Sequence, residues 1–384
     1  MTKTRNKLKI MGLLLTLVVM VSLLGMFSLT ASAAEATIIA QGECGAEGSS
    51  VQWKYDNTGT LTISGTGAMA DFSVGASPWY DYETEITTVV VENGVTYVGK
   101  NSFRTFDNLT TATIADSVEK IGGYAFYSSS KLESVKLSNN LTYISQRAFG
   151  YCSSLASIVI PKSVTYIEGE AFIACSSLTS IEIPDGIEEI GSGLFSGCSS
   201  LTSIKLSDTI TRIGSDAFHG CSSLASITLP DDVSYIGSNA FWECSNLAEI
   251  KLPKSLEKIG TYTFYCCSSL KSIIIPNSVK EIGALAFAGC SNLSGAIPSG
   301  VFGKFSGAPA NYMFRATFYG CSGLEGYVPP ELFAGIGTDT NAHYQMSSVF
   351  SYSGLDTTCP TGTEQYITGF EKYFDGKVSC QPIE

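Results

Sequence analysis

Residues 178–200 read LTSIEIPDGIEEIGSGLFSGCSS, and residues 201–223 read LTSIKLSDTITRIGSDAFHGCSS. These are neighbouring copies of a 23-residue unit that occurs eight times in succession, and a leucine opens each copy: Leu109, Leu132, Leu155, Leu178, Leu201, Leu224, Leu247 and Leu270. A weaker copy begins at Ile86 and an altered one at Leu293. A fixed period of this length predicts a solenoid, in which each copy forms one coil and contacts only its neighbours.

The copies share seven apolar positions. Counted from the opening leucine, position 1 is Leu, 4 is Ile or Val, 6 is Ile or Leu, 10 is Val, Ile or Leu, 13 is Ile, 17 is mostly Ala and 18 is Phe, with few exceptions. Because the residues between them vary freely, we predict that these seven positions point inward and stack on their counterparts. A large side chain buried in this way contributes about 1.5–3 kcal/mol.

The spacing within one copy predicts its local structure. Positions 3–6, residues 180–183 in one copy, alternate polar and apolar and predict a short strand. Prolines at position 7 end this strand because proline has no N–H to donate: Pro161, Pro184, Pro230, Pro253 and Pro276. A second short strand is predicted to end at position 13, as at Ile190, and Gly191 then permits the next bend. The following Ala-Phe segment predicts a single helical or 3₁₀ turn.

The predicted fold is therefore a mainly β repeat solenoid with short helical turns. Strands spaced about 4.8 Å apart would make eight copies into a parallel ladder about 35–40 Å long, within a rod or arc. An N-terminal β cap and a C-terminal cap are expected, since the end coils would otherwise expose apolar surface and unpaired strand edges.

The repeat resembles a known family. The Leu-x-x-Ile-x-Ile opening, the 23-residue period and the phrase IPxSVxxIGxxAFxxCSS resemble the BspA-like, or treponemal-type, leucine-rich repeats of bacterial surface proteins over residues 86–292. Residues 59–69, GTLTISGTGAM, resemble the module that often precedes such arrays. The resemblance implies a secreted or surface-displayed leucine-rich repeat protein, of a class associated with adhesion and with binding of host proteins or glycans.

Residues 1–36 predict a secretory signal peptide. Residues 1–9 carry four positive charges, residues 10–29 are nearly all apolar, and Ala31-Ser32-Ala33 supplies a cleavage pattern. The apolar run is also long enough for an uncleaved membrane anchor, which is the competing interpretation. We expect cleavage near residues 33–36, an extracellular or cell-surface location, and no membrane span in the mature chain.

Residues 37–85 predict the N-terminal β cap. Alternating residues at 51–55 and 61–64 flank the turn Asp56-Asn57-Thr58-Gly59, which indicates a β-hairpin. The aromatic residues Trp53, Trp79 and Tyr80 could stack on a sugar, but burial beneath the first coil is the favoured interpretation.

Residues 293–384 predict enlarged coils and a C-terminal cap. Leu293, Leu324 and Leu355 are each 31 residues apart, which suggests the same coil enlarged by eight residues. Inserts on one face of a solenoid often bind ligands, which makes Tyr312 and His343 candidates. A terminal coil that blocks end-to-end association is the alternative.

Charge and composition limit the function classes. Lys plus Arg number 23 against 35 Asp plus Glu, so the net charge is -12 and nucleic acid is an unfavourable partner. The chain has two histidines and no non-repeated cluster of nucleophile, base and orienting group. We therefore predict a protein without catalysis, cofactor or metal ion.

One cysteine occurs in most copies, at position 21: Cys152, Cys175, Cys198, Cys221, Cys244, Cys267 and Cys290. A disulfide ladder or a row of metal thiolates would fit a secreted protein. However, Phe106 and Ser129 occupy the same position in earlier copies, which favours a packing niche filled by buried free thiols. Cys359 and Cys380 lie outside the column, and we predict a disulfide between them.

Two columns of variable residues are candidate binding surfaces. Position 5 carries Lys136, Glu182 and Lys205, a mixed strip that suits a shallow protein interface. Position 12 carries Tyr143, Tyr166 and Tyr235, and the first two fall on neighbouring coils, where they could form a stacking platform for a sugar or a protein hot spot. Three aspartates at position 8 could hold calcium, although a turn role is favoured: Asp185, Asp208 and Asp231.

The leading functional prediction is a secreted or cell-surface protein that binds extracellular or host proteins. A carbohydrate-binding module and a structural component of the cell envelope are the two alternatives left open.

Overall fold

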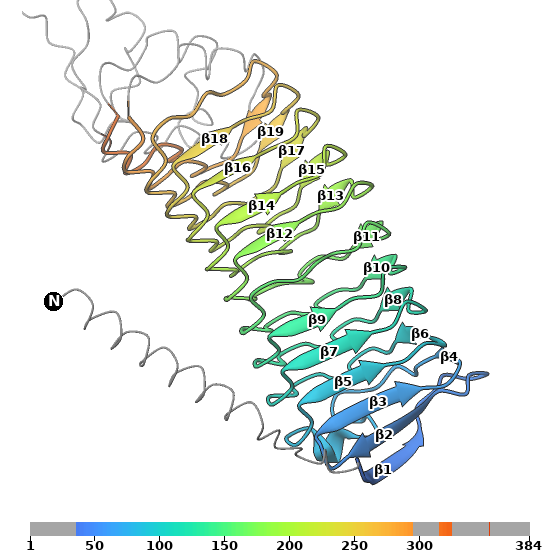
Figure 1. Cartoon of the computed structure of the whole chain (residues 1–384). Coiled ribbons are helices and arrows are strands. Elements are labelled where there is room, and N and C mark those ends of the chain that lie inside the picture. Colours follow the sequence, from blue (N-terminus) through green and yellow to red (C-terminus); the bar gives the residue numbers. More distant parts are fainter. Residues whose placement is uncertain (1–35, 295–314, 325–352, 354–384) are drawn as a thin grey trace, which may run out of the picture. The chain divides into compact units, whose positions relative to one another are not determined.

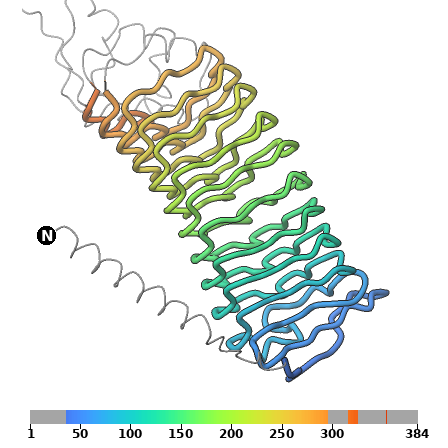
Figure 2. Tube along the Cα trace, in the orientation of Figure 1, coloured from blue at the N-terminus to red at the C-terminus, as the bar shows by residue number. Residues whose placement is uncertain are grey.

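The computed structural model describes residues 36–294, 315–324 and 353, and these form a mainly β solenoid (Figure 1). The 23-residue copies follow one another as stacked coils along the Cα trace (Figure 2). Strand partners in adjacent coils are 23 residues apart, as with Ile181 and Ile204. The predicted fold class is therefore confirmed. Within the described residues, no helix is long and apolar enough to cross a membrane.

The solenoid begins with a hairpin that joins the first coils. Strands β1 (Ile38–Glu43), β2 (Gln52–Asp56) and β3 (Thr60–Ser64) are antiparallel, as the turn at residues 56–59 predicts. Strand β3 then pairs in parallel with β5 (Thr88–Val91), so the sheet changes from antiparallel to parallel pairing there. Trp53 and Trp79 are buried and pack edge to face, 5.9 Å between ring centroids. The burial interpretation is confirmed for Trp53 and Trp79, whereas Tyr80 is half-buried.

Two rows of strands run along the array (Figure 1). The first row carries positions 3–6: β5, β7 (Thr111–Ile114), β9 (Ser134–Lys136), β12 (Ser180–Glu182), β14 (Ser203–Lys205), β16 (Ser226–Thr228) and β18 (Glu249–Lys251). The second row carries positions 12–13: β4 (Gly67–Ala68), β6 (Val95–Val98), β8 (Lys120–Ile121), β10 (Tyr143–Ile144), β11 (Tyr166–Ile167), β13 (Glu189–Ile190), β15 (Arg212–Ile213), β17 (Tyr235–Ile236), β19 (Lys258–Ile259) and β20 (Glu281–Ile282). We name the outward surfaces of these rows the first-strand face and the second-strand face.

Both rows are interrupted. On the first-strand face, the coil that opens at Leu155 forms only an isolated bridge, between Ser157 and Ser180, in place of the predicted strand. On the second-strand face, pairing runs through β11 and begins again at β13. From β8 onward each described strand contributes only two or three residues to a row, so a small displacement of one coil is enough to break the pairing.

The Ala-Phe segment forms a single turn closed by an i→i+3 hydrogen bond, as from the Tyr127 N–H to the Tyr124 carbonyl at 3.2 Å, and the turn does not continue as a helix. Positions 16 and 20 have positive φ throughout the described coils, as at Tyr124 (58°) and Ser128 (59°), and a right-handed helix cannot continue through such residues. Their N–H groups instead donate to the next coil, from Tyr124 to the Gln146 carbonyl at 3.0 Å and from Ser128 to the Gly150 carbonyl at 2.8 Å. The only 3₁₀ helix in the described part, η1 (Tyr80–Tyr82), lies before the repeats.

A row of phenylalanine rings forms the centre of the core. Neighbouring rings lie 5.1–5.9 Å apart between centroids, and the row comprises Phe103, Phe126, Phe149, Phe172, Phe195, Phe218, Phe241, Phe264, Phe287 and Phe318. Trp79 stacks on Phe103 at 5.7 Å and so extends the row into the cap. The opening leucines and the isoleucines of position 13 are also buried, as predicted.

Candidate binding surfaces

The first-strand face carries the predicted residues Lys136, Glu182 and Lys205, all exposed. Glu182 and Lys205 form an ion pair of 2.6 Å between adjacent strands. Because both side chains of this pair are exposed, solvent screens the interaction and both groups remain accessible to a partner.

Sequence reasoning missed the most exposed apolar side chain of this face. Val159 is 81% exposed and belongs to the coil in which the first row is interrupted. It lines two adjoining grooves, one of about 570 Å³ that includes Lys136 and one of about 880 Å³ that includes Glu182 and Lys205. The signal in the sequence was a valine at a position where most copies carry Lys, Glu or Thr.

On the second-strand face, Tyr143 and Tyr166 lie together as predicted. Their ring centroids are 5.1 Å apart with an interplanar angle of 30°. The Nζ of Lys120 lies 4.2 Å from the centroid of the Tyr143 ring, and the Tyr143 hydroxyl donates to Glu168 Oε1. Burial and this hydrogen bond raise the pKa of Tyr143 to about 12, so its hydroxyl is protonated at physiological pH.

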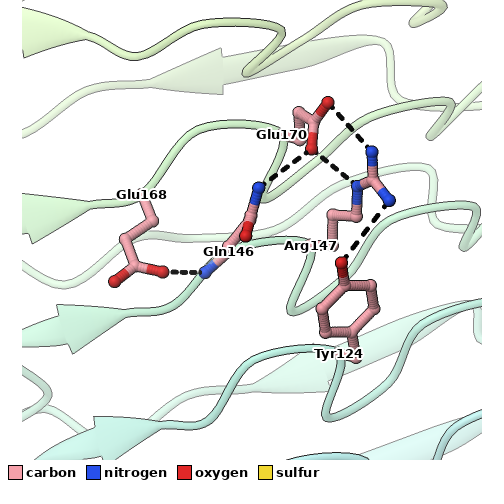
Figure 3. Close-up of polar contacts among 5 residues, drawn as sticks. All are labelled: Tyr124, Gln146, Arg147, Glu168 and Glu170. Carbon is pink, nitrogen blue, oxygen red and sulfur yellow. Dashed lines mark hydrogen bonds and ion pairs between the residues drawn. The ribbon is translucent and has the colours of Figure 1, made fainter.

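A polar network that was not predicted lies beside Tyr143, and Figure 3 shows its members: Tyr124, Gln146, Arg147, Glu168 and Glu170. The Gln146 backbone N–H donates to Glu168 Oε2 at 2.5 Å, and its Nε2 donates to Glu170 Oε2 at 3.2 Å. Arg147 donates to both oxygens of Glu170 at 2.6 and 3.0 Å, and its Nη1 donates to the Tyr124 hydroxyl at 3.4 Å. The available signal was Glu168, which stands in a column that is otherwise glycine or serine.

Tyr235 is not part of this cluster. It lies on β17, beyond the interruption between β11 and β13. The Arg212 guanidinium covers its ring, 4.4 Å from the centroid. The structure thus places two of the three predicted tyrosines together and the third in a separate, covered position.

The aspartates of position 8 do not form a metal site. Asp185 Oδ1 accepts a hydrogen bond from the Ser207 hydroxyl at 3.1 Å. Throughout the described ranges, no group of three or more His, Cys, Asp or Glu side chains is placed to hold a metal ion. His219 lies beside Asp216, 3.7 Å from Nδ1 to Oδ1, and stacks on Trp242.

The cysteine column consists of buried free thiols, which confirms the packing prediction for the described coils. Each Sγ donates to the carbonyl oxygen of the phenylalanine in the preceding coil, as from Cys221 to Phe195 at 3.2 Å. Burial raises the pKa of the Cys198 thiol to about 12. The remaining predicted residues lie outside the described ranges: Tyr312, His343, Cys359 and Cys380.

Comparisons with known proteins agree with this architecture. The BspA type leucine-rich repeat region matches residues 77–200 and 169–294, with six copies. No curated protein matches the chain.

Solved structures of leucine-rich repeat proteins are similar to this chain. A leucine-rich repeat protein from Bacteroides ovatus is 26% identical, with a TM-score of 0.58 over 80% of this chain and 75% of that one. One from Eubacterium ventriosum is 21% identical, with a TM-score of 0.49 over 84% and 97%. A leucine rich cell surface protein from Faecalibacterium prausnitzii is 23% identical, with a TM-score of 0.44 over 85% and 97%. Because the matched repeats span more than half of its residues, the chain belongs to the family of BspA-type leucine-rich repeat proteins.

Proposed function

We propose that this chain is a non-catalytic protein of the cell surface or extracellular space that binds an extracellular or host protein through its first-strand face. The observation that carries the proposal is Val159, which is 81% exposed between two adjoining grooves. An apolar side chain surrounded by charged ones is the arrangement of a protein interface, with an apolar centre and a polar rim.

The surroundings of Val159 fit a protein better than a small molecule. The grooves are open to solvent, and their lining carries both signs of charge: Lys136, Lys162 and Lys205 with Glu182 and Asp185. Small-molecule sites are usually concave and mostly apolar, whereas this surface is extended and mixed. Repeat proteins commonly use such extended faces for binding.

A catalytic role is not supported by the side chains of the described ranges. His219 has Asp216 and Trp242 as neighbours, and no nucleophile is recorded within hydrogen-bond reach of it there. The extracellular location is part of the proposal and rests on residues 1–36 and on the resemblance of the repeats to those of bacterial surface proteins.

The test is binding of residues 37–384 to immobilised fibronectin, laminin and fibrinogen, compared with Val159→Asp and Thr228→Asp variants. Thr228 is exposed at the same repeat position three coils away, outside both grooves. We expect saturable binding that Val159→Asp weakens at least tenfold, about 1.4 kcal/mol, and that Thr228→Asp leaves unchanged. Equal loss in both variants, or no binding to any of the three proteins, would contradict the proposal.

A further inference from the structure

We propose a second ligand site, on the second-strand face, in which Tyr166 is a stacking platform for a neutral pyranose sugar of an extracellular polysaccharide. The site is separate from the groove at Val159 and does not depend on protein binding there. Its components are the exposed Tyr166 ring, the carboxylate of Glu168 and the network that fixes this carboxylate.

Tyr143 supports the platform but is not itself available. In the register of the second row, Lys120 pairs with Tyr143 and Tyr143 pairs with Tyr166. The ring of Tyr143 therefore lies between the Lys120 ammonium at 4.2 Å and the Tyr166 ring at 5.1 Å. Both of its faces are occupied, which leaves Tyr166, 54% exposed, as the accessible ring.

The interruption of the second row frees the outer side of Tyr166. The next residue in its column, Glu189, pairs with Arg212 on the far side, and no pairing joins β11 to β13 within the described coils. A Cβ added to Gly191 would lie 3.1 Å from its nearest neighbour, compared with 2.3–2.7 Å at the next four glycines of this column: Gly214, Gly237, Gly260 and Gly283. At position 14 the backbone of this coil is thus less tightly apposed to its neighbour than in the coils farther along.

The polar groups beside the platform are held in place. Glu168 accepts from the Tyr143 hydroxyl with one oxygen and from the Gln146 N–H with the other. Each carboxylate oxygen has a second lone pair, so Glu168 retains the capacity to accept from a sugar hydroxyl. Because Glu168 is already oriented, binding would cost little side-chain entropy.

The charges of the site point to a neutral ligand. The site has two positive side chains, Lys120 and Arg147, and three negative ones, Glu168, Glu170 and Glu189, so its net charge is -1. The whole chain carries -12. An anionic polysaccharide would be repelled. A neutral pyranose presents C–H groups to an aromatic face and hydroxyl groups to carboxylates, which matches the two kinds of group found here.

The experiment is affinity gel electrophoresis of residues 37–384 in gels that contain hydroxyethylcellulose, xyloglucan, galactomannan or the anionic polygalacturonate. We expect at least one neutral polymer to retard the protein. Tyr166→Ala should weaken this retardation at least tenfold, whereas Tyr166→Phe should retain it. The matched control is Tyr235→Ala, at the same repeat position but beneath Arg212, which should leave retardation unchanged.

Several results would overturn the site: no retardation by the neutral polymers, retardation by polygalacturonate alone, or equal loss in Tyr166→Ala and Tyr235→Ala. Circular dichroism of each variant separates loss of the site from loss of the fold. Val159→Asp should not affect retardation, so failure of this inference and failure of the protein-binding proposal are distinguishable.

Discussion

The hydroxyl of Ser129 donates a hydrogen bond to the carbonyl oxygen of Phe103, 2.7 Å away in the preceding coil. The thiols that occupy the same position in later coils donate to the equivalent carbonyls, as from Cys152 to Phe126 at 3.1 Å and from Cys221 to Phe195 at 3.2 Å. From Ser129 onward the described column therefore carries a small side chain with one hydrogen to donate, whereas Phe106 fills the position in the first coil. Cysteine and serine satisfy that requirement, and disulfide chemistry is not involved.

Replacement of Cys221 tests this requirement. Cys221→Ala should lower the free energy of unfolding by about 1–3 kcal/mol, because it removes buried volume and leaves a second lone pair of the Phe195 carbonyl without its donor. Cys221→Ser should cost less, since Ser129 shows that a hydroxyl can make the same bond. The measurement is urea denaturation followed by circular dichroism, and a serine variant less stable than the alanine variant would contradict the interpretation.

The buried thiols also predict instability in alkali. Burial raises the pKa of Cys198 and Cys321 to about 12, and that of the neighbouring column thiols in the same direction, whereas an unfolded thiol titrates near 8.5. Above the unfolded pKa the unfolded chain has lost protons that the folded chain keeps, so stability falls as pH rises. The contribution is complete below about pH 8.5 and lost towards pH 12, with a slope of about 1.4 kcal/mol per pH unit for each thiol.

Urea midpoints measured between pH 8 and 11 provide the test. Tyrosine residues with raised pKa, such as Tyr143, change stability in the same direction, so the informative comparison is with Cys221→Ser. The serine variant lacks one titrating thiol and should lose stability less steeply than the native chain. Identical slopes would show that the column does not determine the alkaline response.

The repeat fold could be predicted from sequence because every copy carries apolar residues at the same positions. Each buried position recurs with period 23, so the core, the strand positions and the free thiols followed from the columns. The positive φ angles of the turn at positions 16–20 could not be predicted from the columns, because residues as different as Tyr124, Arg147 and Leu285 all adopt them. That conformation is imposed by hydrogen bonds to the next coil, and no residue type marks it.

The candidate surfaces were predicted less completely, since they lie where individual copies differ from the repeat pattern. The Tyr143–Tyr166 pair followed from adjacency in one column, and the column also separates Tyr235, because Glu189 and Arg212 occupy the two coils between. The column does not reveal the break in strand pairing between β11 and β13. Val159 and Glu168 were visible only as exceptions within their columns. Only the structure shows that Val159 lines a groove and that Glu168 accepts hydrogen bonds from the neighbouring coil.

The glycines of position 14 have a different role from the one predicted. They do not adopt positive φ, so they are not needed for the bend at Gly191 and its counterparts. A Cβ added at Gly237 would instead lie 2.6 Å from the Ser215 backbone nitrogen in the preceding coil. We expect Gly237→Ala to lower the free energy of unfolding by about 1–3 kcal/mol, because adjacent coils must move apart.

Gly123 is the matched control for this substitution. A Cβ added there would lie 3.4 Å from its nearest neighbour, the Gln146 carbonyl oxygen, and its φ is not positive. Gly123→Ala should be neutral or stabilising by up to about 1 kcal/mol, since alanine restricts the unfolded chain. Thermal unfolding of both variants gives the comparison, and similar losses would mean that coil spacing does not explain the glycine column.

The last prediction concerns the positive φ of position 20. Glu243 has φ 58° on the surface, whereas Gly197, Gly220 and Gly289 fill the same position in other coils. A Cβ in this conformation costs roughly 1–2 kcal/mol, partly offset by the greater freedom of glycine in the unfolded chain. Glu243→Gly should therefore be more stable than Glu243→Ala by about 1 kcal/mol in urea denaturation. If alanine equals glycine there, the backbone of the turn relaxes in solution and the hydrogen bond from residue 243 to the Tyr265 carbonyl does not enforce the conformation.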